Sequence, residues 1–397
     1  MNTERTRLLY IQPSENFGGA ERQAAALIPL LPRYGFDVTA LVGPGSVIVD
    51  WLRAAGVEDI VHSPSFPRDW AESRGFERLG RAADFVSHVD PVASEIDGLL
   101  ESRGIDVVLA SMAFSWAAAT AVCRDRRVPI LWRAGGTELS LPQRVVLPMW
   151  SHRHPPDALV CNSQAVKDMF APLIPAPAYV VRNGVDTTLF QRDPALGQAL
   201  RPPGARVVVG FAGRLVPQKR PEDFLQMAAE VAAHHPEVSF LVAGDGSRRP
   251  HFEAMAAELG LAHPVHFLGL VRDMRAFFSA LDVLVLPSRS EGCPNIVLEA
   301  MAMQVAVVAS DTHATHEVVR PGIDGLLFPP GNIPALVAAV EAMVVDEAGR
   351  RRMALAALGR ARADLGAAQS ARRLAEVIAE VLPLAPALPS VQAEGGA

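Results

Sequence analysis

The sequence predicts an α/β protein made of two doubly wound domains, each built on a parallel sheet. Short runs of apolar residues alternate along the whole chain with longer amphipathic stretches, as in repeated strand–helix units. The short runs are continuously apolar rather than alternating, which is typical of parallel strands buried on both faces. The predicted strands are 7–12, 37–42, 59–62, 106–110, 128–132, 158–161 and 179–182, followed by 206–212, 238–243, 265–268, 282–286 and 305–309.

Chain length and turn chemistry predict where one domain ends and the next begins. The 397 residues suit two domains of ordinary size. The stretch 183–205 contains Asn-Gly, Asp-Pro and Pro-Pro-Gly sequences, which favour turns and linkers. We therefore expect an N-terminal domain at 1–190 and a C-terminal domain at 191–365. The remainder, 366–397, is expected to form a helix that returns to the N-terminal domain, followed by a loose tail rich in Pro, Ala and Gly.

Composition and charge exclude several classes of function. The 37 basic and 43 acidic side chains give a formal net charge of −6, and neither half of the chain is basic, so nucleic-acid binding is not expected. The three cysteines lie far apart without CxxC spacing, which indicates neither a zinc site nor a disulfide framework. The longest uncharged run is too short to span a membrane. The sequence thus predicts a cytoplasmic protein, and leaves open a peripheral contact with the inner face of the membrane.

The loop after strand 7–12 contains two adjacent glycines, Gly18 and Gly19, directly before a helical pattern. Glycines at a helix start let the backbone approach a ligand closely, with N–H groups directed at it. This arrangement fits contact with a phosphate or with another part of a substrate. A tight turn needed only for packing fits the two glycines equally well.

The loop after strand 206–212 carries two cations, Arg214 and Lys219. Such a pair suits a diphosphate, whose negative charge grows as it departs. Lys219 is one of only two lysines among the 37 basic residues, so the sequence favours a compact point charge at this position. Cations also occur in surface loops that bind nothing. The next loop begins Gly244-Asp245-Gly246 but lacks the third glycine of a dinucleotide fingerprint.

The segment after strand 282–286 is the most informative part of the sequence. Glu291 stands in the loop, and Glu299 lies eight residues further on, about two turns along one face of the expected helix. Apolar residues flank Glu299, and a carboxylate among them needs a partner. We expect the helix to begin at its proline, so that backbone N–H groups at its N-terminus can hold an anion or sugar hydroxyls. The residues at this helix start are Gly292, Cys293, Pro294 and Asn295.

In this order, the motifs resemble those of the retaining nucleotide-sugar glycosyltransferases of family 4, also called group 1. The resemblance spans about residues 7–380 and includes the sequence Asn183-Gly184-Val185-Asp186. It implies the GT-B fold, in which two Rossmann-like α/β domains face a central cleft. It also implies a nucleotide-sugar donor of the UDP or GDP type, held mainly by the C-terminal domain. The acceptor would be a hydroxyl group of a glycan, a lipid-linked sugar or a natural product. Retention of configuration is implied, and no cofactor or essential metal.

The resemblance assigns roles to individual residues. Arg214 and Lys219 would bind the donor diphosphate and stabilise it as it leaves. Glu291 would bind hydroxyls of the transferred sugar, and Glu299 would bind the ribose. The other donor contacts would come from Gly18, Gly19, Gly292, Cys293, Pro294 and Asn295, with the base near His266 and Leu268.

The sequence departs from the family pattern at positions that concern the site. The family often has a histidine after the strand that matches 128–132, and no histidine stands there in this chain. Arg133 or Glu138 would have to supply the contact of that histidine with the donor sugar. His313 and Ala314 replace two glycines. His313 is therefore a candidate sugar or acceptor contact, since an HxxH spacing without further ligands does not make a metal site.

Other functions fit parts of this sequence. A nucleotide-sugar 2-epimerase of the same fold would turn over the donor without an acceptor. A transferase-like binding module without catalysis would have lost the diphosphate cations or the carboxylates, and all four are present. An NAD-dependent dehydrogenase needs a complete glycine fingerprint, which is missing. Glu291 and Glu299 together with Arg214 and Lys219 favour the transferase over the epimerase, and the resemblance implies a retaining hexosyltransferase.

Overall fold

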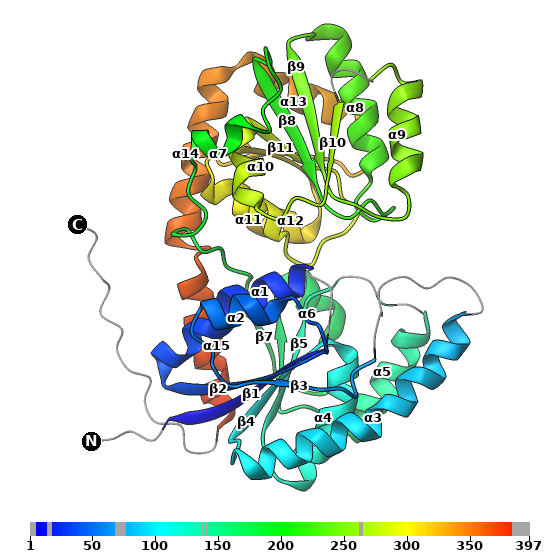
Figure 1. The fold of residues 1–397 in the computed structure, drawn as a ribbon, viewed down its shortest axis with the longest axis vertical. Helices are drawn as coiled ribbons and strands as arrows, with labels where there is room; N and C mark the ends of the chain where they lie inside the picture. The colour runs from blue at the N-terminus through cyan, green and yellow to red at the C-terminus, as the bar shows by residue number, and fades with distance from the viewer. Residues whose placement is uncertain are drawn as a thin grey trace. The chain divides into compact units, whose positions relative to one another are not determined.

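The computed structural model describes residues 5–13, 18–67, 77–136, 139, 141–261 and 265–382. It contains two parallel sheets, and contacts within the chain divide it into two compact units (Figure 1). Unit 1 comprises Met1–Gly184 and Ala367–Ala397, and unit 2 comprises Val185–Gly366. The predicted fold class, two doubly wound α/β units with parallel sheets, is confirmed.

Unit 1 is built on a seven-stranded parallel sheet in the order β3-β2-β1-β4-β5-β6-β7. The order reverses between β1 and β4, and such sheets bind ligands beyond the carboxyl ends of the strands at that point. The strands are β1 (Thr6–Gln12), β2 (Phe36–Val42), β3 (Ile60–His62), β4 (Val107–Ser111), β5 (Ile130–Ala134), β6 (Ala158–Cys161) and β7 (Ala178–Val180). The helices are α1 (Gly19–Leu27), η1 (Ile28–Tyr34), α2 (Ile48–Ala54), α3 (Glu77–Ser102), α4 (Met112–Asp125), α5 (Leu141–Arg153), α6 (Gln164–Phe170) and α15 (Ala367–Val381).

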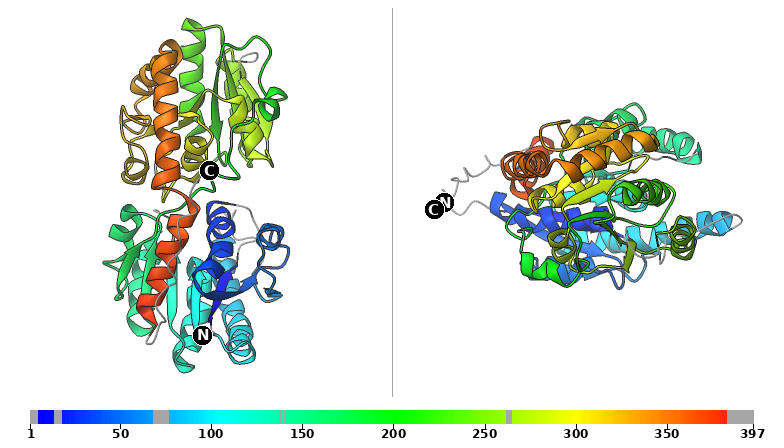
Figure 2. Two further views of the ribbon diagram at one scale, coloured as in Figure 1. Left: turned by 90° about the vertical axis from the view of Figure 1, so that its left-hand side faces the viewer. Right: turned by 90° about the horizontal axis from the view of Figure 1, so that it is seen from above.

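Alternate residues of each strand enter two cores, one on either face of the sheet. In β1, Leu8 and Tyr10 pack with α1, η1 and α15, whereas Leu9 and Ile11 pack with α3 and α4. All four side chains are fully buried. Helices lie on both faces of the sheet (Figure 2). Burial on both faces explains why the strand sequences are continuously apolar.

Unit 2 repeats the plan with a six-stranded parallel sheet in the order β10-β9-β8-β11-β12-β13. Its order reverses between β8 and β11. The strands are β8 (Val207–Ala212), β9 (Val238–Ala243), β10 (Val265–Gly269), β11 (Val283–Leu286), β12 (Ala306–Ser310) and β13 (Leu326–Phe328). The helices are α7 (Pro194–Gln198), α8 (Pro221–His234), α9 (Arg249–Glu258), α10 (Met274–Ala280), α11 (Asn295–Ala302), α12 (His313–Val318), α13 (Ile333–Val345) and α14 (Glu347–Ala363).

Every strand predicted from the sequence is present, with its ends displaced by at most two residues. The sequence analysis missed β13, which has three residues and pairs only with β12. Two of its three side chains are only partly buried. A run this short at a sheet edge carries no pattern that separates it from a loop.

The motif 183–186 lies where the chain passes from unit 1 into unit 2. Gly184 is tied to unit 1, because its N–H and C=O pair with the side-chain amide of Gln23 at 3.0 and 3.1 Å. Val185 is tied to unit 2, because its N–H donates to Leu365 O at 2.9 Å. The change of unit therefore falls between two consecutive residues.

The chain returns to unit 1 after Gly366, and α15 packs against the core of that unit. Leu374 and Ile378 are fully buried in the same cluster as β1. The hydroxyl of Tyr34 in η1 donates to Ala368 O at 3.1 Å, near the start of α15. The last helix in the sequence is thus an integral layer of the first unit.

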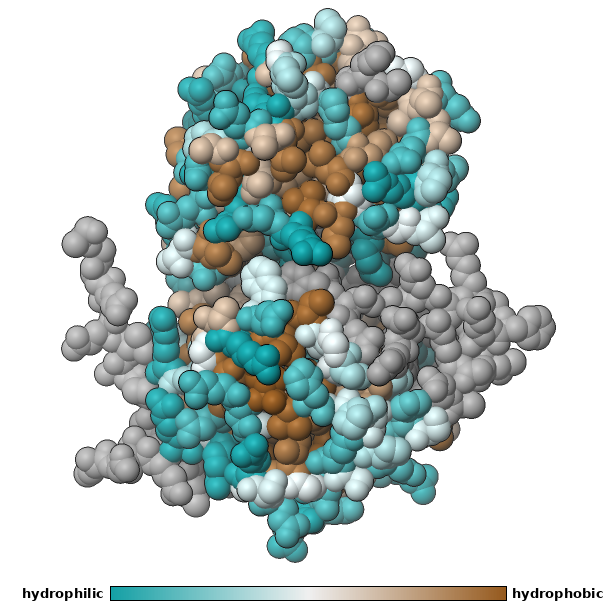
Figure 3. Space-filling view, viewed as in Figure 1, coloured by the Kyte–Doolittle hydropathy of each residue, from teal (hydrophilic) through white to brown (hydrophobic). Residues whose placement is uncertain are grey.

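Among the described residues, no helix is both long and apolar enough to cross a lipid bilayer. On the face shown in Figure 3, hydrophobic residues of both units are interrupted by hydrophilic ones.

Replacing Leu374 with Ala should destabilise unit 1 by about 2–5 kcal/mol, because it opens a cavity in a packed core. All five tryptophans precede residue 151, so their fluorescence in a denaturant titration reports the unfolding of unit 1. Leu270→Ala, at a leucine of unit 2 that is 76% exposed, is the matched control and should leave the transition in place. Coincident transitions for Leu374→Ala and the wild type would contradict a stabilising role of α15.

Candidate active site

The loops that follow β8 to β11 meet at the carboxyl edge of the unit 2 sheet, because its strands are parallel. Backbone hydrogen bonds join these loops. Gly213 N–H donates to Ala243 O at 3.0 Å, and Leu215 N–H donates to Asp245 O at 3.2 Å. The loop that carries Arg214 is therefore held on both sides of that residue.

Lys219 and Glu291 form an ion pair across two of these loops, with 2.6 Å between Nζ and Oε1. Their side chains are only 19% and 9% exposed. Gln218 supports the contact, since its backbone O accepts from Arg289 N–H at 2.9 Å and its side-chain amide donates to Ser290 O at 3.2 Å. The structure thus brings together two of the predicted catalytic residues.

The ion pair leaves hydrogen-bonding capacity on both partners. An ammonium group has three donors, and Glu291 takes one of those of Lys219. In the described part of the chain, Oε2 of Glu291 has no hydrogen-bond partner. Electrostatic interactions are stronger at such a nearly buried position than in water. A ligand that carries both an anionic group and a hydroxyl can therefore bind Lys219 and Glu291 together.

Arg214 and Arg220 flank Lys219 but differ in availability. Arg220 donates to the Asp223 carboxylate at 2.5 and 2.8 Å, and this hydrogen bonding raises the pKa of Arg220 above its usual value. Arg214 is exposed, and its side chain makes no hydrogen bond or ion pair with any residue that the structure describes. Arg214 is thus the second cation of this loop that a ligand can reach.

Gly244 lets the loops after β8 and β9 approach each other. Its φ is +141°, and a Cβ atom there would lie 1.9 Å from Gly213 O. Any other residue must push the backbone beside Arg214 out of place. The Gly244-Asp245-Gly246 sequence is therefore a close-approach turn at the edge of the site.

The segment after β11 carries the other carboxylates. The prediction that Pro294 is the first helical residue is wrong: Pro294 precedes α11 with φ −77° and ψ 93°, and this extended ψ keeps it outside the helix. Glu291, Cys293 and Glu299 are 8%, 8% and 6% exposed. The two carboxylates therefore lie in one short, largely buried segment, with the backbone of residues 292–295 between them.

The structure does not bring His266 to the carboxyl edge. His266 is the second residue of β10, three residues before Gly269. At about 3.3 Å per residue, it lies about 10 Å from the end of the strand. Its side chain is exposed, whereas Leu268, next to the strand end, is half-buried.

The sequence analysis missed Gln218 and Arg249. Gln218 joins the loop after β8 to the loop after β11, as described above. Arg249 lies 3.7 Å from Asp245 and 2.7 Å from Glu253, beside the loop after β9. Neither residue belongs to a recognisable motif. Only their positions could have indicated them: Gln218 lies in the connection between β8 and α8, and Arg249 is the first residue of α9.

In unit 1, Gly18 and Gly19 are exposed at the start of α1. The N–H of Gly18 donates to Oε2 of Glu21 at 2.8 Å, and Oε1 of Glu21 accepts from the Gln12 side-chain amide at 2.9 Å. The Gly18 N–H is therefore used within the protein. Glu21, which the sequence analysis did not single out as a site residue, sets the geometry of this helix start.

Arg133 belongs to a buried polar network in unit 1. It is the fourth residue of β5, is 8% exposed, and hydrogen-bonds Tyr10. The Tyr10 hydroxyl donates to Gln12 Oε1 at 2.6 Å. Burial raises the pKa of Tyr10 to about 12, and the charge of Arg133 opposes this shift whereas that of Glu21 adds to it. Glu138, the other candidate for the missing histidine contact, lies outside the described residues.

His313 is the exposed first residue of α12. His316, one turn later, has Nδ1 2.9 Å from Asp311 Oδ1. Within the ranges that the structure describes, no three His, Cys, Asp or Glu side chains are grouped so that they could hold a metal ion.

The two parallel-sheet α/β units have the fold of the GT-B class. Residues 17–189 match the family model "Glycosyltransferase Family 4", and residues 206–346 match "Glycosyl transferases group 1". The chain belongs to the family 4, group 1 glycosyltransferases, as its motifs predict.

Solved structures share the fold over nearly the whole chain. HepE of Anabaena, in complex with UDP and glucose, has a TM-score of 0.77 at 20% identity, covering 95% of this chain and 100% of that protein. Sucrose-phosphate synthase from Thermosynechococcus elongatus has a TM-score of 0.77 at 18% identity, covering 95% and 99%. At these identities the likeness concerns the fold.

Curated relatives are similar over shorter stretches. The α-D-kanosaminyltransferase of Streptomyces kanamyceticus is 32% identical over 151 residues, which are 38% of this chain and 39% of the relative. The lipopolysaccharide core mannosyltransferase LpcC of Rhizobium leguminosarum bv. viciae is 31% identical over 199 residues, 48% of this chain and 55% of the relative. The chain thus matches about half, or less, of the length of these relatives.

Gly244→Ala should weaken nucleoside diphosphate binding by about tenfold or more, because the new Cβ displaces the backbone beside Arg214. Gly260→Ala is the matched control, since Gly260 also has a positive φ, +73°, but has nothing within 4 Å of its Cβ position. Calorimetric titration of both variants with UDP and GDP measures the effect. Equal affinities for the two variants would contradict the role given to this close approach.

Proposed function

We propose that the protein transfers a hexose from a UDP- or GDP-sugar to a hydroxyl acceptor, with retention of anomeric configuration. The observation that carries this proposal is the 2.6 Å ion pair of Lys219 and Glu291, with the exposed Arg214 in the same loop as the lysine. Unit 2 then holds the donor, and unit 1 serves the acceptor. UDP and UDP-glucose, the ligands of the Anabaena protein, are the first to test.

Arg214 and Lys219 contact the donor diphosphate in this proposal. As the bond between the anomeric carbon and the diphosphate oxygen breaks, negative charge grows on the leaving group. Fixed cations stabilise that charge most strongly in the transition state, which is the condition for catalysis. Because two side-chain cations supply the neutralisation, we expect no requirement for a divalent metal.

Glu291 binds a hydroxyl of the transferred sugar through Oε2, while Oε1 stays paired with Lys219. One residue pair then holds both the sugar and the diphosphate, and so fixes the bond that breaks between them. Glu299, buried on α11, binds the ribose hydroxyls in this proposal. The backbone of residues 292–295 lies between these carboxylates and contacts the sugar.

Retention follows if the acceptor attacks from the face that the diphosphate leaves. The acceptor oxygen forms its bond to the anomeric carbon as the bond to the diphosphate oxygen breaks. The acceptor proton passes to an oxygen of the departing diphosphate, so the products are the glycoside and a nucleoside diphosphate. No side chain has to act as a general base.

Lys219→Met should weaken nucleoside diphosphate binding by at least about tenfold, because a charge-assisted bond to phosphate is lost. It should also lower the melting temperature, since it leaves Glu291 unpaired. The double variant Lys219→Met/Glu291→Gln should recover stability but not binding, and it separates the two effects. Lys167→Met, at the other lysine of the chain, is the control.

Calorimetry with UDP, GDP, UDP-glucose and NAD, with and without EDTA, gives the affinities. Product analysis with radiolabelled donor distinguishes transfer from epimerisation of the donor alone. Binding of NAD but of no nucleoside diphosphate, or unchanged binding in Lys219→Met, would refute the donor site.

Peripheral membrane contact is proposed at α5 of unit 1. Val145, Val146 and Met149 on this helix are 62%, 61% and 73% exposed. Arg144 and Arg153, on the same helix, are exposed cations. Apolar side chains accompanied by cations suit the surface of an anionic bilayer. A lipid-linked acceptor would meet unit 1 at such a surface.

Met149→Glu should lower cosedimentation with phosphatidylglycerol vesicles by about tenfold, because a carboxylate replaces an inserted apolar group next to anionic lipid. Leu270→Glu makes the same kind of change at a 76% exposed apolar residue of unit 2 and should leave binding unchanged. If both variants sediment like the wild type, α5 is not the contact.

A further inference from the structure

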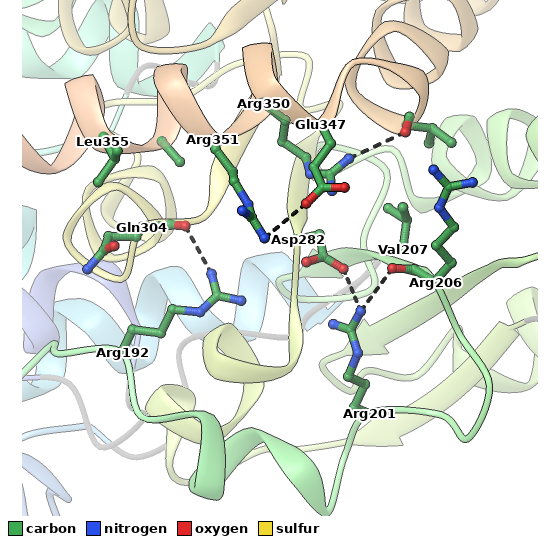
Figure 4. A pocket seen from close by; sticks show the side chains of 12 residues that line it. Arg192, Arg201, Arg206, Val207, Asp282, Gln304, Glu347, Arg350, Arg351 and Leu355 are labelled. Carbon is green, nitrogen blue, oxygen red and sulfur yellow. Dashed lines mark hydrogen bonds and ion pairs between the residues drawn. The ribbon is translucent and has the colours of Figure 1, made fainter.

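Unit 2 has a polar hollow at the amino edge of its sheet (Figure 4). Its volume is about 460 Å³, within the range of small-molecule sites. Val207 begins β8 and Asp282 directly precedes β11, so the hollow lies at the ends of these strands opposite to Arg214 and Glu291. Since β8 has six residues, at about 3.3 Å per residue the two regions are about 20 Å apart.

Arginines dominate the lining of this hollow. It contains Arg192, Arg201, Arg206, Arg350 and Arg351, with Asp282 and Glu347 as carboxylates, so the formal charge of the lining is +3. The chain as a whole carries −6. A concave region lined by one sign of charge concentrates the opposite ion. The hollow is therefore a local reversal of the charge of the protein.

Backbone carbonyls hold two of the arginines in place. Arg192 donates to Leu281 O at 2.8 Å and to Gln304 O at 3.0 Å. Arg201 donates to Ala280 O at 2.9 Å, to Arg206 O at 3.1 Å and to the Asp282 carboxylate at 2.9 Å. Each guanidinium has five N–H donors, so these bonds orient the groups and leave donors for a ligand.

The other arginines include one with no structural role in the described part of the chain. Arg350 donates to Met343 O at 2.6 Å, and Arg351 pairs with Glu347 at 2.9 Å. Arg206 is exposed, and among the described residues its side chain has no hydrogen-bond or ion-pair partner. Hydrogen bonds to backbone carbonyls therefore explain the presence of only some of the arginines in this hollow.

The positively charged arginines in the hollow repel one another. Burial lowers the pKa of Arg192, the charge of Asp282 counteracts this, and the charge of Arg201 lowers it further. An anion in the hollow would relieve this repulsion and accept from the donors that remain.

We propose that this hollow binds a phosphate-bearing anion. Guanidinium groups match phosphate oxygens with pairs of parallel hydrogen bonds, and guanidiniums from two walls converge on a volume that a small phosphorylated molecule fits. The phosphate belongs either to a soluble compound or to a lipid headgroup, which share this recognition chemistry. The site is distinct from the donor loops and does not depend on the proposed transferase activity.

Calorimetric titration of the full chain with pyrophosphate tests whether the hollow binds a soluble phosphate compound. The Arg214→Ala variant serves as the parent, because pyrophosphate also fits the donor loop. In this parent, Arg206→Gln/Arg351→Gln should weaken pyrophosphate binding by at least about tenfold without changing the melting temperature. Arg352→Gln, the next residue on α14, exposed and outside the lining, is the matched control and should bind like the parent.

Vesicle sedimentation tests whether the hollow binds a lipid headgroup. It compares phosphatidylcholine vesicles that contain phosphatidylinositol 4-phosphate with vesicles of phosphatidylcholine alone. Vesicle binding that the Arg206→Gln/Arg351→Gln change abolishes, without pyrophosphate binding in the parent, assigns the site to a headgroup. Pyrophosphate binding that the same change weakens assigns it to a soluble phosphate. The proposal is overturned if the double variant equals the parent in both arms, or if Arg352→Gln loses as much binding.

Discussion

The ion pair of Lys219 and Glu291 is the interaction on which the candidate site depends. The two residues are 72 positions apart in the chain and 2.6 Å apart in space. Removing either partner leaves the other charge at a nearly buried position, where desolvation is costly. The effect of the pair is therefore positional: it holds the loop after β8 against the loop after β11. Arg214 lies in the first of these loops, and Glu299 is reached through the second.

Unit 2 uses lysine and arginine for different tasks. Nearly all of the 37 basic residues are arginines, and those at the amino edge of the sheet, such as Arg192 and Arg201, bind carbonyls and carboxylates through fixed planar groups. Lys219, at the carboxyl edge, is a compact charge with rotatable donors. It can stay paired with Glu291 and still meet a ligand. An arginine there would fix more of its donors to the carboxylate.

Sequence patterns could predict features that depend on neighbouring residues in the chain. They could not predict contacts between segments that lie far apart in the chain. The strands and the loop residues Arg214, Lys219 and Glu291 follow from apolar runs and the chemistry next to them. The contact between Lys219 and Glu291 could not be derived, because three helices separate them in the chain. His266 was named as a donor contact although the predicted strand 265–268 already places it near the amino end, and β10 (Val265–Gly269) keeps it there. The arginine hollow has no motif, since its residues come from several separate connections and α14.

The polar groups around Gln12 and Tyr10 in unit 1 hydrogen-bond one another. Glu21 accepts from Gly18 N–H and from Gln12, and Arg133 bonds to Tyr10. With a pKa of about 12, Tyr10 stays neutral at physiological pH and does not balance the charge of Arg133. Arg133 and Glu21 have opposite effects on the pKa of this phenol, so a cation and a carboxylate both act on Tyr10 in unit 1. In the proposed function, the charge of the donor diphosphate is therefore met in unit 2, where Arg214 and Lys219 retain unused donors.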